Sequence, residues 1–77
     1  MDNMKRLELA AEDNGEALRL AMDFGITIGP DYQSSFAVVV AKDEDMEHYA
    51  LERVGNDQCA AARRAIVRVA SEIMKAV

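Results

Sequence analysis

The sequence predicts an α+β domain with α-β-β-β-α order, in which a three-stranded antiparallel sheet has both helices packed on one face. An apolar pattern of helical period runs through residues 4–24. Residues 25–54 contain β-branched runs separated by turn signals. Residues 57–77 are alanine-rich and again typical of a helix. A chain of 77 residues has room for one domain, so we assign residues 1–77 to a single unit.

The first segment has a helical composition with a break signal at its centre. Its apolar residues recur every three or four positions and predict one buried stripe made of Met4, Leu7, Ala11, Leu18, Ala21 and Met22. Asn14-Gly15 either weakens one long helix or ends a first element, so that Asn14 caps a second helix over residues 15–24. Gly25 is expected to stop the helix. A hairpin around Asn14-Gly15 is less favoured, because the flanking segments contain few β-branched residues.

The middle segment predicts three short strands. Ile26-Thr27-Ile28 is a β-branched run that Gly29-Pro30 ends. Residues 36–40 give the strongest strand pattern, and their three consecutive valines are typical of a central strand. Residues 42–45 form the predicted hairpin loop. Residues 47–54 form the returning strand, although a short helix is the alternative there because Glu, Ala and Leu are frequent.

The last segment predicts a long helix that begins after Asp57, which is expected to cap it. A helical wheel predicts a buried stripe of Ala62, Ile66, Val69, Ile73 and Val77, widened by Cys59 and Ala70. The opposite side of the helix carries Arg64, Arg68, Ser71 and Lys75.

Composition and charge restrict the class of protein. The sequence contains no run of 18 apolar residues and its start lacks the apolar core of a signal peptide, so we expect a soluble, cytoplasmic protein without a membrane segment. One cysteine and one histidine exclude an internal disulfide and a zinc site of several thiolates. We therefore expect no cofactor and no metal, and self-association as a homodimer is the remaining way to supplement a small core.

The net charge of −5 is unevenly distributed along the chain. Residues 1–56 contain five basic and twelve acidic side chains, whereas residues 57–77 contain four basic and two acidic ones. An acidic chain repels phosphate backbones, which makes nucleic acid the less favoured partner and leaves a basic protein surface or plain solubility as explanations.

Three groups of side chains are candidates for chemistry or binding. Cys59 and His48 are the only conventional nucleophile and base; Cys59 is expected to be a buried, inert thiol and His48 a surface or partly buried residue, so we expect no enzyme. The acidic residues of the hairpin lack the spacing of a calcium loop, and we interpret them, with a neighbouring aromatic residue, as the partner-binding surface: Asp43, Glu44, Asp45, Glu47 and Tyr49. The alternative is a nucleic-acid-binding face made of Arg64, Arg68 and Lys75.

Residues 29–70 resemble a double-stranded RNA-binding domain. The resemblance rests on Gly29-Pro30 and the residues up to Phe36, on the turn Val54-Gly55-Asn56, and on Ala61, Ala65 and Ile66 in the last helix. It implies the same α-β-β-β-α topology. The family binds phosphates through lysines at the start of its last helix, where this chain has Asp57-Gln58-Cys59-Ala60, so the resemblance implies protein binding or dimerisation rather than RNA binding.

In general character the chain is similar to small accessory and host-takeover proteins of bacteriophages, among them anti-CRISPR and other anti-defence inhibitors. The sequence therefore predicts a non-enzymatic interaction module, of which a phage-type inhibitor is one form, that binds a larger protein with a basic surface.

Overall fold

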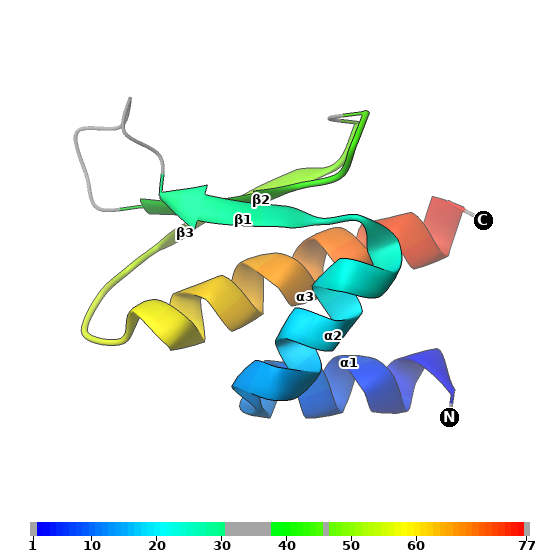
Figure 1. Ribbon diagram of the computed structural model, residues 1–77, viewed down its shortest axis with the longest axis horizontal. Coiled ribbons are helices and arrows are strands. Elements are labelled where there is room, and N and C mark those ends of the chain that lie inside the picture. Colours follow the sequence, from blue (N-terminus) through cyan, green and yellow to red (C-terminus); the bar gives the residue numbers. More distant parts are fainter. Residues whose placement is uncertain (1, 31–37, 46, 77) are drawn as a thin grey trace.

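The computed structural model describes residues 2–30, 38–45 and 47–76. Its elements follow in the order α1 (Asn3–Glu12), α2 (Asn14–Phe24), β1 (Thr27–Pro30), β2 (Val38–Lys42), β3 (Tyr49–Arg53) and α3 (Gln58–Ala76) (Figure 1). The predicted α+β class, the three strands and the closing helix are confirmed. The expectation that Gly29-Pro30 ends the first strand is wrong, because both residues belong to β1 and pair with β2. The residues predicted to start the second strand, 36 and 37, lie outside the described part of the chain.

The segment before the sheet forms two helices, and the residue that separates them is Asp13. Its backbone is extended, with φ −131° and ψ 126°, and its side chain accepts a hydrogen bond of 2.8 Å from the amide of Glu16. A side chain that satisfies a free amide at the start of a helix is a strong N-cap. The cap of α2 is therefore Asp13 rather than Asn14. Gly25 ends α2 in the left-handed conformation, φ 67°, as predicted.

The sheet is antiparallel in the order β1-β2-β3, so the valine-rich strand is central, as predicted. Val40 pairs with Gly29 on one side and with Leu51 on the other. Val39, Ala41 and Ala50 are buried toward the helices, because successive side chains of a strand point to opposite faces. Tyr49 and Leu51 stand on the other face and are exposed.

The helices lie on one side of the sheet in two layers (Figure 1). Only α3 packs broadly on the strands, while α1 and α2 pack on each other and on α3. The prediction that the helical segments pack on one face of the sheet is confirmed, and α3 lies between the sheet and the two N-terminal helices. The outer face of the sheet is covered by none of the described elements.

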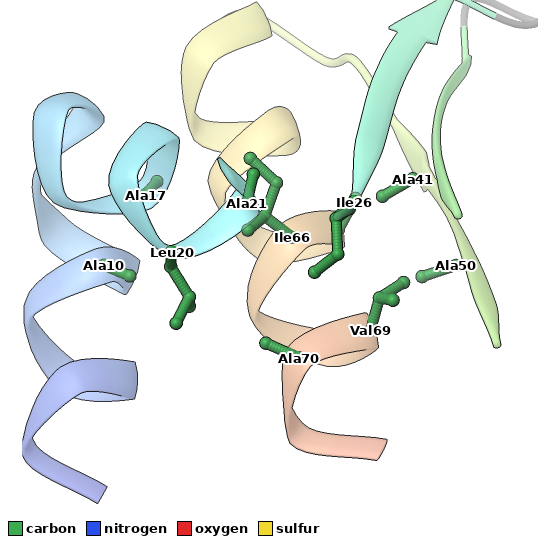
Figure 2. Packing of buried hydrophobic residues seen from close by; sticks show 11 residues of the cluster. Ala10, Ala17, Leu20, Ala21, Ile26, Ala41, Ala50, Ile66, Val69 and Ala70 are labelled. Carbon is green, nitrogen blue, oxygen red and sulfur yellow. The ribbon is translucent and has the colours of Figure 1, made fainter. Parts of the chain in front are cut away.

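The core is built largely from alanine. Leu20 projects from α2 into the space between α1 and α3, and Val69 of α3 faces Ala50 of the sheet (Figure 2). The other buried residues include eight alanines: Ala10, Ala17, Ala21, Ala41, Ala50, Ala61, Ala65 and Ala70. Alanine side chains allow backbones to approach closely, so three layers can form from a short chain.

Both predicted helical stripes were partly wrong. Met4, Leu18 and Met22 are exposed, because the extended residue Asp13 interrupts the helical period on which one continuous stripe depends. In α3 the wheel assumed one buried face, whereas this helix is covered by the sheet on one side and by α1 and α2 on the other. Ala61 and Ala65 are therefore fully buried, while Ala62 is half-buried and Cys59 is exposed.

Enlarging a buried alanine of α3 should be far more damaging than enlarging a half-buried one. We expect Ala65→Leu to lower the free energy of unfolding by about 1–3 kcal/mol, because the added atoms must force the layers apart. Ala62→Leu, the matched control beside open space, should change it by less than about 0.5 kcal/mol. Urea unfolding followed by circular dichroism measures both. Equal losses in the two variants would contradict this packing.

Candidate functional site

The predicted acidic residues gather on the turn between β2 and β3. We call Asp43, Glu44, Asp45 and Glu47 the acidic turn. The amide of Asp43 donates to the carbonyl of His48 at 3.1 Å, and the amide of His48 donates to the Asp43 carboxylate at 3.4 Å. These two bonds close the base of the turn, so its carboxylates are held at one end of the sheet.

A hollow of about 250 Å³ lies beneath the acidic turn. Its lining combines the four carboxylates and His48 with two apolar side chains, Phe24 from the end of α2 and Ile73 from α3. Glu44 lies over Gly25, at the junction of α2 and β1. The guanidinium of Arg6 lies 5.9 Å from the centre of the Phe24 ring and pairs with Asp23. The lining of the site thus combines acidic and apolar side chains.

A second hollow, of about 370 Å³, adjoins the first along β3 and shares Glu47 and His48 with it. Tyr49, Ala50, Arg68 and Glu72 complete its lining. Tyr49 is 67% exposed, so its ring is available for contact. The structure therefore brings all five predicted partner-binding residues to one end of the molecule. It adds Glu72, Phe24 and Ile73, which sequence reasoning missed because only the fold brings α2 and α3 beside the turn.

The predicted basic face has partners within the chain. Glu52, whose side chain is 17% exposed, accepts from Arg64 at 2.9 Å and also from Arg68. The same guanidiniums donate to backbone carbonyls of β3, Arg64 to that of Arg53 at 3.2 Å and Arg68 to that of Leu51 at 3.4 Å. The two arginines hold the pKa of Glu52 below its ordinary value. These contacts join α3 to β3.

The remaining basic side chains of α3 also make contacts. Lys75 lies 3.7 Å from Glu72, and Arg63 donates to the carbonyl of Ala11 at 3.1 Å and to the side chain of Asn14. Arg63 thus ties α3 to the junction of α1 and α2. A phosphate on this face would compete with carboxylates and carbonyls that these cations already contact.

Cys59 and His48 line different hollows. Cys59 is exposed, so its expected burial was wrong; it borders an apolar hollow of about 200 Å³ with Leu18 and Ile28. His48 is partly buried beside the acidic turn, as predicted. Among residues 2–30, 38–45 and 47–76, no three His, Cys, Asp or Glu side chains are grouped to hold a metal ion. Within the same ranges, every helix is too short or too polar to cross a membrane.

No protein-family model, curated protein or solved structure matches this chain. The resemblance to double-stranded RNA-binding domains and the likeness to phage proteins therefore stay predictions.

The contacts of Glu52 predict a pH-dependent stability. The pKa of Glu52 is lower in the folded chain than in the unfolded chain. Its ionised form therefore stabilises the fold at pH values above the unfolded pKa, and this stabilisation is lost as the pH falls through the folded pKa. At pH 7 we expect Glu52→Gln to lower the free energy of unfolding by about 1–2 kcal/mol, the range for hydrogen bonds to charged groups at a partly exposed site. The difference between variant and wild type should shrink as the pH falls below about 4.3. Urea titrations at several pH values measure it, and a constant difference would contradict this assignment.

Proposed function

We propose that this chain is a non-enzymatic interaction module that binds a basic surface of a larger protein through the acidic turn. The observation that supports it is the mixed lining of the site: four carboxylates line the same hollow as the apolar side chains of Phe24 and Ile73. Lysine and arginine side chains combine a charged head with an apolar stem, and this arrangement suits both parts.

The electrostatics of the whole chain favour the same partner. With a net charge of −5, the protein attracts basic surfaces at long range, and complementary charge accelerates encounter. Exposed Tyr49, beside the turn, is an aromatic side chain of the kind that anchors protein interfaces. Because Arg64, Arg68 and Lys75 already contact carboxylates, the nucleic-acid alternative is less favoured than protein binding.

A module of this kind acts as an inhibitor when the basic surface that it covers is one that its target needs for binding anions such as nucleic acid. In its more specific form, the proposal is that this chain is a bacteriophage-type inhibitor that binds a host defence protein in the cytoplasm. It rests on the size and charge of the chain and on the site geometry together.

The partner can be sought by affinity capture from a bacterial lysate with the tagged protein, with and without nuclease. We expect one dominant basic protein to remain after nuclease treatment. Capture that disappears with nuclease would favour nucleic-acid binding, and a steep salt dependence on duplex RNA or DNA would confirm it. Size-exclusion chromatography with light scattering separates both outcomes from a homodimer.

Reversing charge on the acidic turn should weaken partner binding without unfolding the chain. Glu44→Lys combined with Asp45→Lys replaces two exposed carboxylates and should reduce affinity at least about tenfold, since each like-charge contact opposes association. The control, Glu8→Lys with Glu12→Lys, makes the same charge change on exposed positions of α1 and should have a much smaller effect. Titration calorimetry with the captured partner measures both. Equal losses would show that only net charge matters, and unchanged affinity would remove the turn from the interface.

A further inference from the structure

The backbone of β3 is directed so that half of its polar groups face away from the sheet. The carbonyl of His48 accepts from Asp43 on the β2 side, whereas the carbonyls of Leu51 and Arg53 accept from arginines of α3. In an antiparallel strand, the amides and carbonyls of every second residue point to the same edge. The amides and carbonyls of Tyr49, Leu51 and Arg53 therefore lie on the outer edge of β3.

This outer edge is closed at one end and open at the other. Arg68 covers the Leu51 carbonyl and Arg64 covers the Arg53 carbonyl. By the β2–β3 register the backbone groups of Tyr49 and the amide of Leu51 point away from β2, and outside the sheet no described residue bonds to them. An unpaired strand edge is a template for another strand. Here that template is limited to about the length of Tyr49–Leu51, because the arginines occupy the remainder.

The hollow of about 370 Å³ lies beside this open part of the edge, and its charge specifies an occupant. Glu47 and Glu72 line it from the turn and from α3. Arg68, which also lines it, is paired with Glu52, and the contact of Glu72 with Lys75 is exposed and 3.7 Å long. A lysine or arginine side chain entering here meets negative charge.

We propose that the partner contributes a short extended basic segment, which adds as a strand to the edge of β3 at Tyr49–Leu51 and places a lysine or arginine side chain in the hollow with Glu47 and Glu72. This rests on the proposed function and names the form in which the partner presents its charge. Main-chain hydrogen bonds supply affinity in strand addition, and side-chain pockets supply specificity.

The test uses the ¹⁵N-labelled full chain and a synthetic peptide, acetyl-Val-Lys-Val-Lys-Val-amide. We expect the peptide to shift the amide signals of Tyr49 and Leu51. A peptide of the same sequence with every backbone amide N-methylated keeps the charge but cannot donate, and should bind at least about tenfold more weakly. Equal binding of both peptides, shifts that omit Tyr49 and Leu51, or no binding up to about 5 mM peptide would each overturn strand addition.

Two pairs of variants identify the contacts. Tyr49→Pro removes the outward amide at the start of an edge strand, where proline is tolerated, and should abolish peptide binding. Tyr49→Val keeps the amide and loses only the contacts of the aromatic ring, so it should bind the peptide more tightly than Tyr49→Pro does. Glu47→Gln with Glu72→Gln should weaken binding several-fold, and Glu8→Gln with Glu12→Gln should not. If Tyr49→Pro does not fold, the comparison of the unmodified and N-methylated peptides on the wild-type chain tests strand addition instead. The two proposals can fail separately. If Glu44→Lys with Asp45→Lys no longer captures the partner but the peptide test fails, the proposed function stands and strand addition at β3 is refuted.

Discussion

The close approach of the layers on both sides of α3 is the constraint on which the rest of the structure depends. This helix separates the sheet from α1 and α2, and it packs against both of these layers. Alanine occupies most of the buried positions, and fully buried side chains as large as Leu20 and Val69 are few. The orientation of β3, the position of the acidic turn and the placement of Glu72 beside it all follow from where α3 lies.

The sequence supplied the elements but not the way in which they face one another. The consecutive valines of β2 and the glycine after α2 act locally, so their roles could be predicted. The helical stripes depended on a wheel with one buried face, which fails for a helix that is covered on two sides. The break before α2 was recognised as an alternative, although its cap is Asp13 rather than Asn14.

In the candidate site, too, the features that depend on neighbouring residues could be predicted, and those that depend on the fold could not. The residues of the acidic turn are neighbours in the chain, so their clustering needed no fold to be foreseen. Phe24, Ile73 and Glu72 come from helices distant in sequence, and no local pattern marks them as part of it. Glu52 alternates with exposed residues on β3 and carries no signal of its own; its importance arises only because two arginines, one helical turn apart, face it from α3.

The alanine core also bears on how stability varies with temperature. The heat capacity change of unfolding is governed by the apolar surface that becomes exposed, and a buried methyl group contributes little of it. With Met4, Leu18, Met22, Tyr49 and Leu51 already in solvent when folded, the chain has few large apolar side chains left to hydrate. A small heat capacity change flattens the curve of free energy against temperature, so this domain should be modestly stable over a wide thermal range rather than strongly stable at one optimum.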